Sequence, residues 1–405
     1  MEIKKSKKLH DVRYDIRGKV STLATKMEYE GTQIIKLNTG NPAAFGFKPP
    51  GNLVDLLSRD LQLTAAYSDS KGLLTAREAI VEYEKSKGIQ NVHIDRVFTG
   101  NGVSELITMS MQALLNEGDE ILIPSPDYPL WTAAARLAGG TVVHYICDDK
   151  ADWLPSLEDI ERKINSRTRA IVVISPNNPT GAVYPKEILE GICNLARQHK
   201  LLILSDEIYD RLLMDNEKHF AISSLAPDIP VITLNGLSKS HQLCGFRAGW
   251  MVIGGNVTGL DDFLDGINVL ASMRLCSNVL AQSIIPTALA DPHYAKKELL
   301  PGGRLYEQRE QAYVGMKSIP GISVVKPKAA LYMFPKVDIE KFGIHDDELF
   351  VLDFLREKHV LLTHGRGYQW DKPDHFRLVY LPEKDVMADV IERLGDFLGN
   401  YRQKN

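Results

Sequence analysis

Cysteine is scarce in this 405-residue sequence, which has four cysteines and no CxxC or Cys/His ligand spacing. This pattern is typical of a reducing compartment and argues against a metal site, so we predict no bound metal. No apolar run approaches the roughly 20 residues that span a bilayer, and the N-terminus lacks the apolar core of a signal peptide. We therefore expect a soluble, cytoplasmic protein that does not bind membranes.

A large excess of charge is also absent. The sequence has 48 basic and 52 acidic residues and a net charge of -4, which gives no electrostatic reason to expect nucleic-acid binding. Four lysines within the first eight residues are typical of a solvated tail rather than a binding patch. The length and the apolar fraction of 44% are sufficient for two globular domains.

Short apolar runs alternate with helical patterns between residues 97 and 255. The predicted strands cover 121–123, 141–146, 170–174, 201–204, 231–234 and 250–253, and predicted helices cover 104–115, 130–137 and 186–199. This alternation predicts an α/β fold with a mostly parallel sheet, in which ligands bind beyond the carboxyl ends of the strands. A long helical region is predicted from about residue 257 past Arg274, and a second, smaller α/β unit follows from about residue 300.

Lys239 follows the buried strand 231–234 and is flanked by small residues. An ammonium group at the end of a buried strand is costly unless it has a use, and we interpret Lys239 as forming a Schiff base with an aldehyde cofactor. Arg247 is placed to hold an anion. For Lys239 considered alone, the alternative is a solvated lysine in a surface loop.

A glycine-rich turn at residues 99–103 leads into a predicted helix. Its backbone N–H groups, with the Ser104 hydroxyl, form a potential anion cradle; the alternative is that Ser104 simply caps the helix. The turn lacks the third glycine of a dinucleotide fingerprint, and the chain has no GK[ST] P-loop. A nicotinamide-dependent dehydrogenase is therefore disfavoured.

Other polar residues follow the remaining strands. Asp206 ends a buried strand and needs a cationic partner such as a protonated pyridine nitrogen, unless it caps a helix, and Tyr209 is close enough in sequence to reach the same ring. Asn178 lies in a rigid loop of prolines and glycine, where its amide offers both a donor and an acceptor, although a simple turn is the alternative. Tyr128 is suited to stack on a flat ring or to pack in the core. Arg377 interrupts an apolar strand and suits bidentate carboxylate binding or a surface ion pair.

Together these features describe pyridoxal phosphate, a flat aromatic aldehyde with a phosphate group and a basic ring nitrogen. The sequence resembles the class I aminotransferases of fold type I over nearly its whole length, and is most similar to bacterial alanine (glutamate–pyruvate) aminotransferases. The resemblance is carried by Asn177-Asn178-Pro179-Thr180-Gly181, Asp206-Glu207-Ile208-Tyr209, Ser238-Lys239 with Arg247, and Phe376-Arg377. It implies a large domain at residues 49–295 with a mostly parallel, seven-stranded mixed sheet, a smaller α/β domain at 296–405, and an N-terminal arm at 1–48 that joins the smaller domain.

The resemblance also implies residue roles. Lys239 would carry the cofactor and shuttle a proton, and Asp206 would keep the pyridine nitrogen protonated. The other implied cofactor contacts are Tyr209 and Asn178 on the ring oxygen, Tyr128 on the ring face, and Val103, Ser104, Ser238, Arg247 and the neighbouring subunit's Tyr67 on the phosphate. The implied substrate contacts are Arg377, Asn178, Gly40 and Tyr128. The activity would be a ping-pong exchange of the amino group between L-alanine and 2-oxoglutarate in a homodimer with shared sites.

The sequence departs from the aspartate branch of this family at two points. Gly236 stands where a serine or threonine often contacts the phosphate, and no residue clearly matches the second arginine that binds dicarboxylic substrates. We hypothesise that Arg17 binds the distal carboxylate of glutamate, with Tyr14 closing the pocket. The alternatives are an aminotransferase for another neutral or aromatic amino acid, a C–S lyase, and a non-catalytic regulator that senses the cofactor.

Overall fold

The computed structural model describes residues 2–10 and 12–404, and its largest sheet has seven strands in the order β2-β8-β7-β6-β5-β3-β4. The strands are β2 (Val97–Asn101), β3 (Glu120–Ser125), β4 (Thr141–Ile146), β5 (Thr168–Ile174), β6 (Leu202–Asp206), β7 (Val231–Gly236) and β8 (Ala248–Gly254). Strand β8 is antiparallel to both of its neighbours, and the other pairs are parallel. The predicted mixed, mostly parallel sheet is therefore confirmed.

Helices cover both faces of this sheet. The helices α4 (Val103–Leu114), α5 (Leu130–Leu137) and α10 (Asp261–Met273) contribute to the core on one face, and α6 (Leu157–Lys163) and α7 (Lys186–His199) to the core on the other. Alternate residues of each strand enter opposite cores: Ile171 and Val173 pack with α7, whereas Val172 packs with α4. The central strands are consequently apolar on both sides, as the sequence pattern predicted.

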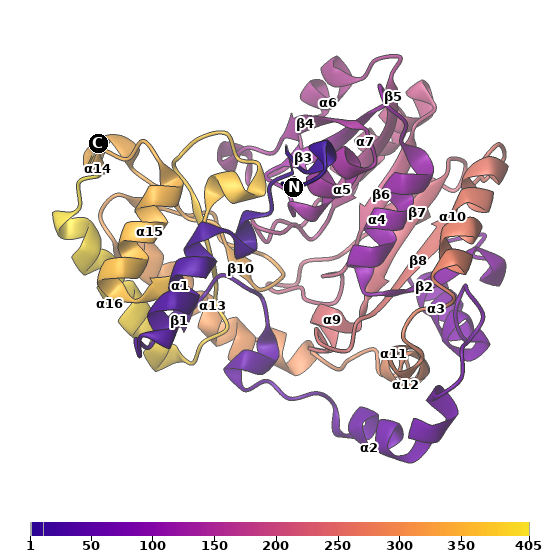
Figure 1. The fold of residues 1–405 in the computed structure, drawn as a ribbon, viewed down its shortest axis with the longest axis horizontal. Coiled ribbons are helices and arrows are strands. Elements are labelled where there is room, and N and C mark those ends of the chain that lie inside the picture. Colours follow the sequence, from indigo (N-terminus) through magenta and orange to yellow (C-terminus); the bar gives the residue numbers. More distant parts are fainter. Residues whose placement is uncertain (1, 11, 405) are drawn as a thin grey trace.

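The N-terminal arm packs against the C-terminal part of the chain (Figure 1). Helix α1 (Lys19–Tyr29) contacts α15 (Asp347–Lys358), and β1 (Ile35–Lys36) pairs in parallel with β12 (Val360–Leu361). This unit is built around an apolar core that includes residues of α13 (Arg304–Ser318) and α16 (Lys384–Asn400), and Tyr209, Leu212 and Met214 from the segment after β6 also join it. The substrate-binding arginine predicted at position 377 lies on β14 (Phe376–Val379) of this unit.

Among the described residues, the structure contains eleven further α-helices and strands. They are α2 (Gly51–Asp60), α3 (Leu74–Ser86), α8 (Ile222–Leu225), α9 (Leu237–Ser240), α11 (Val279–Ser283), α12 (Ile285–Leu289), α14 (Ile339–Phe342), β9 (Ile322–Ser323), β10 (Tyr332–Met333), β11 (Lys336–Val337) and β13 (Thr363–His364). Within the described part of the chain, no helix is long and apolar enough to cross a membrane.

The predicted long helix past Arg274 is wrong at its C-terminal end. Helix α10 stops at Met273, Leu275 adopts a left-handed φ of 68°, and the next helix begins at Val279. The break turns the Arg274 guanidinium inward to a carbonyl of β2, where it donates to Thr99 O at 2.7 Å. A continuing helix would not make this contact.

A row of three glycines brings β2, β8 and β7 close to the helix that follows β2. Gly249 pairs with Gly100 on one side and Gly236 on the other. A Cβ atom at Gly249 would lie 2.6 Å from the backbone of Gly102 and Val103, closer than van der Waals contact allows. The absent side chains therefore let the start of α4 rest directly on β8.

We predict that Gly249→Ala reduces the free energy of unfolding by about 1–3 kcal/mol, because the added methyl group forces the start of α4 away from β8. Chemical denaturation of the cofactor-free protein measures this change. Gly399→Ala is the matched control, since a Cβ atom there has no neighbour within 4 Å. Equal stability of the two variants would contradict the proposed contact.

Candidate active site

A cavity of about 620 Å³ opens at the carboxyl ends of β5, β6 and β7. The predicted site residues that line it are Tyr14, Arg17, Gly40, Val103, Ser104, Tyr128, Asn178, Asp206, Tyr209, Ser238, Lys239, Arg247 and Arg377. Tyr67 does not line the cavity, and its side chain is 78% exposed. The fold thus brings together residues from both ends of the chain and leaves one predicted residue outside.

Asp206 ends β6 and is almost completely buried. Its carboxylate accepts a hydrogen bond from Trp131 Nε1 at 3.1 Å and another from the Ile208 N–H at 3.3 Å. Among the described side chains, none of the cations forms an ion pair with it, and burial raises its pKa to about 6. The contact with Ile208 is local, and no helix of the described chain starts there, so the helix-cap alternative is not supported.

Lys239 lies in the short helix α9, directly after β7. Its Nζ donates to the Gly40 carbonyl at 2.7 Å and lies 3.7 Å from Cys244 Sγ. The amine faces the same cavity as Asp206 and is half-buried, so the alternative of a solvated surface lysine is wrong. The ammonium is instead held by one backbone carbonyl in a confined space.

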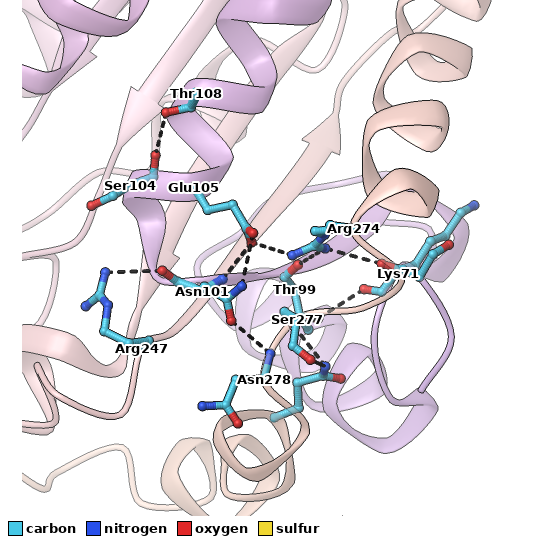
Figure 2. A network of polar contacts seen from close by, with 12 residues as sticks. Lys71, Thr99, Asn101, Ser104, Glu105, Thr108, Arg247, Arg274, Ser277 and Asn278 are labelled. Carbon is cyan, nitrogen blue, oxygen red and sulfur yellow. Dashed lines mark hydrogen bonds and ion pairs between the residues drawn. The ribbon is translucent and has the colours of Figure 1, made fainter. Parts of the chain in front are cut away.

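Arg247 and the first turn of α4 form one end of the cavity. Gly102, with a left-handed φ of 78°, is the residue that caps the helix. Ser104 is the second residue inside the helix, so the helix-cap alternative is wrong. Figure 2 shows Arg247 pointing toward the start of this helix, where its guanidinium donates to the Asn101 carbonyl at 3.2 Å. It also donates to the Cys244 carbonyl at 2.8 Å. A guanidinium beside unpaired helix N–H groups is a favourable place for an anion.

Arg377 defines the other end of the cavity. Its side chain is 2% exposed, and its guanidinium lies over the rings of Tyr332 and Tyr368 at 4.3 and 4.7 Å. It donates to Asn178 Oδ1 at 2.9 Å and to the Asn38 carbonyl. No carboxylate of the described residues pairs with it, and its Nε has no hydrogen-bond partner. The alternative of a surface ion pair is therefore wrong.

Four tyrosines complete the cavity wall. Burial raises the pKa of Tyr209 well above its usual range, and its hydroxyl donates to Tyr332 at 2.8 Å. The hydroxyl groups of Tyr14 and Tyr128 lie 2.9 Å apart, which joins the N-terminal arm to the loop after β3. Arg17 ends the short 3-10 helix that begins at Asp15, and its exposed side chain reaches the rim of the cavity.

Sequence reasoning missed three of these residues. Tyr332 contacts both Tyr209 and Arg377, but in the sequence it is one aromatic residue of an apolar strand. Trp131 supports Asp206, and the only available signal was that a buried indole N–H needs an acceptor. Cys244 lines the cavity beside the lysine, where no spacing pattern singles it out.

Gly236 has a structural reason for departing from the related sequences. A Cβ atom at this position would lie 2.6 Å from the Ala248 carbonyl oxygen and 3.0 Å from Gly249 Cα. The adjacent strand β8 thus excludes a side chain here. The hydroxyl of Ser238 is 3.5 Å from Arg247 Nη1, so it is the nearby side chain available for an anion at this end of the cavity.

The charges in the cavity define the ligand that it suits. The charged groups that line this space are the Asp206 carboxylate, the Lys239 amine and the guanidinium groups of Arg17, Arg247 and Arg377. Among the described residues, Asp206, Arg247 and Arg377 have no ion-pair partner. Buried charges of this kind require compensation. The cavity therefore suits a ligand set with one cationic group at Asp206 and anionic groups at Arg247 and Arg377.

Comparisons with known proteins agree with this geometry. A family model described as aminotransferase class I and II matches residues 32–394. The chain is 54% identical to the glutamate–pyruvate aminotransferase AlaA of Haemophilus influenzae, over 98% of this chain and 99% of the relative. It is 52% identical to the alanine aminotransferase of Mycobacterium bovis, over 98% of this chain and 93% of the relative.

Solved structures share the fold over the full chain. A crystal structure of an aminotransferase from Escherichia coli is 51% identical and matches with a TM-score of 0.99, covering 100% of both chains. The alanine aminotransferase of Pyrococcus furiosus is 38% identical with a TM-score of 0.93, covering 98% of this chain and 100% of that one.

We predict that Asp206→Asn changes how the stability of the cofactor-free protein depends on pH. The pKa of Asp206 is raised from 3.8 to about 6 in the folded protein. Its contribution to the free energy of unfolding is therefore fully present below pH 4 and is lost as the pH rises through about 6. Asparagine has no such loss, so the variant should gain roughly 3 kcal/mol on the wild type across this interval. Urea unfolding at several pH values measures the difference. A constant difference between the two proteins would show that Asp206 is not perturbed.

Proposed function

The chain belongs to the class I and II aminotransferases, and we propose that it exchanges the amino group between L-alanine and 2-oxoglutarate, giving pyruvate and L-glutamate by a ping-pong route. The observation that carries this proposal is the identity of 54% and 52%, over nearly the whole chain, to proteins named glutamate–pyruvate and alanine aminotransferase. This evidence favours alanine over the alternatives of another amino acid, a C–S lyase or a regulator.

Aminotransferases of this family use pyridoxal phosphate, and the cavity fits that group. The carboxylate of Asp206 suits a protonated ring nitrogen, and Arg247 with the start of α4 suits a phosphate. The Lys239 amine faces the same cavity. When bound, pyridoxal phosphate supplies an electron sink for bond breaking at the amino-acid α-carbon.

We assign the following roles to the protein residues. Lys239 would hold the cofactor aldehyde until the substrate amine displaces it. Its freed amine would then take the proton from the substrate α-carbon as general base and return it on the cofactor side as general acid. Asp206 keeps a positive charge on the ring nitrogen, and Tyr209 with Asn178 orients the ring oxygen. Arg377 binds the substrate α-carboxylate, supported by Asn178, which already accepts from it at 2.9 Å.

The remaining contacts are proposed on the same basis. Tyr128 covers the ring face, the Gly40 backbone faces the substrate, and Val103, Ser104, Ser238 and Arg247 hold the phosphate. Aminotransferases of this fold act on amino acids and 2-oxo acids and typically form dimers. We propose a homodimer in which the exposed Tyr67 of one subunit reaches the phosphate site of the other.

The proposed division into domains places the boundaries after residues 48 and 295, with the arm added to the smaller domain. The apolar core shared by α1 and the C-terminal elements supports this division, and Tyr209, Leu212 and Met214 of the large domain also join that core. The proposed compartment is the cytoplasm, whose reducing conditions suit the free thiols of the four cysteines.

The absorption spectrum of the cofactor-loaded protein tests the function. We expect a visible band that L-alanine bleaches and 2-oxoglutarate restores, because each substrate completes one half of the exchange. Lys239→Ala is the matched control, since it lacks the amine and should not complete the cycle. If L-alanine leaves the band unchanged, alanine is not the amino donor. If the protein does not take up pyridoxal phosphate, the assignment as an aminotransferase is wrong.

Glutamate carries a second carboxylate, and the position of Arg17 at the cavity rim supports a contact with it. The Tyr14–Tyr128 hydrogen bond holds the neighbouring part of the arm over the cavity, so the arginine is restrained near the substrate. Arg17 is thus proposed to distinguish glutamate, which has a distal carboxylate, from alanine, which has none.

We predict that Arg17→Ala raises KM for glutamate by about tenfold while KM for alanine changes little, because only glutamate loses a charged hydrogen bond. Steady-state kinetics in both directions measure the two constants. Arg13→Ala is the control, since Arg13 is a nearby arginine that does not line the cavity. Equal changes in both constants would remove the assignment.

A further inference from the structure

Glu105 lies in the first turn of α4 and folds back over the start of the helix (Figure 2). Its carboxylate accepts from the Asn101 backbone N–H at 2.8 Å and from the Asn101 side-chain amide at 3.0 Å. The Asn101 side-chain oxygen accepts from the Asn278 N–H at 2.9 Å. Asn101 is thereby fixed on both sides, and its carbonyl is the acceptor for Arg247.

This arrangement places a negative charge at the helix end that the phosphate is proposed to occupy. Helix N-termini attract anions, but two anions at the same end repel each other. The Glu105 side chain is only 25% exposed, so water screens its charge incompletely. Without a counterion, the residue that orders Asn101 would therefore weaken phosphate binding.

Arg274 supplies that counterion from the break after α10. Its guanidinium pairs with Glu105 and donates to the Thr99 carbonyl at 2.7 Å and the Ser70 carbonyl at 3.2 Å (Figure 2). The side chain is 14% exposed. The guanidinium is thus held by Glu105 and by two backbone carbonyls, and Arg274 does not line the cavity, so we do not treat it as a direct phosphate ligand.

We propose that Arg274 is a positioning residue for the cofactor phosphate: it neutralises Glu105, so that Glu105 orders Asn101 and the start of α4 without repelling the phosphate. This inference rests on the proposed placement of the phosphate at α4. The effect depends on the charge of the phosphate and not on the pyridine ring. Pyridoxal, which lacks the phosphate, therefore separates this role from general support of the fold.

The test compares the dissociation constants of the cofactor-free protein for pyridoxal phosphate and for pyridoxal. Arg274→Met should raise the dissociation constant for pyridoxal phosphate about tenfold, as expected for one unbalanced charge near the site. The dissociation constant for pyridoxal should change much less. Adding Glu105→Gln to this variant should restore most of the preference for the phosphorylated form. Glu105→Gln alone should keep that preference at or above the wild-type level.

Arg169→Met is the matched control, because Arg169 pairs with Asp119 at the opposite ends of the strands and should leave the preference unchanged. The inference would be overturned if Arg274→Met weakened the binding of both compounds equally, or weakened neither. A lower preference in Glu105→Gln would also overturn it, and this variant decides the matter if Arg274→Met does not fold. If the wild-type protein itself shows no preference for pyridoxal phosphate, the placement of the phosphate is wrong.

Discussion

Charges that have no partner within the chain are the central constraint of this structure. Asp206 and Arg377 are 3% and 2% exposed, and their neighbours are an indole N–H, backbone groups, one amide and two aromatic rings. Such partners solvate a charge but do not neutralise it, so the folded protein bears the cost of burying them. Ligands that carry the complementary charges recover that cost. The charges of Asp206 and Arg377 are therefore uncompensated in the empty cavity and compensated when the ligands are bound.

The sheet makes this arrangement possible. Strands β5, β6 and β7 run in parallel and end at one edge, so residues far apart in sequence meet there without long excursions of the chain. The glycines at positions 100 and 249 let the start of helix α4 lie directly on the sheet, so the N-terminus of α4 is at the same edge. Arg377 arrives from the other unit, on β14. The ligand site thus lies where the seven-stranded sheet meets the unit that contains β14.

The sequence predicted the sheet and most of the site because both depend on local signals. Asp206 ends a buried strand and Lys239 closely follows one, and a charged residue there is conspicuous without any knowledge of its neighbours. Tyr332 and Trp131 were not predicted, because their importance comes from contacts with residues distant in the sequence, such as Tyr209 and Asp206. An aromatic residue within an apolar stretch has the same local pattern whether it packs in a core or lines a cavity.

Two adjacent carboxylates show why such contacts decide function. Asp206 and Glu207 are both buried, and burial alone would raise the pKa of each carboxyl group. Glu207 pairs with Lys87 at 2.8 Å and His219 at 3.0 Å, which hold its pKa at about 2, whereas the pKa of Asp206 is raised to about 6.

Successive residues leaving a strand point in opposite directions, so Glu207 enters a cluster with Lys87 and His219, and Asp206 enters the cavity. In the sequence, the pair Asp-Glu does not reveal which acid is paired, because Lys87 comes from the end of α3, 119 positions before Asp206. The positions of the cationic side chains in the folded structure therefore determine which carboxylate remains available for a ligand. At this site it is the one that lacks a cation.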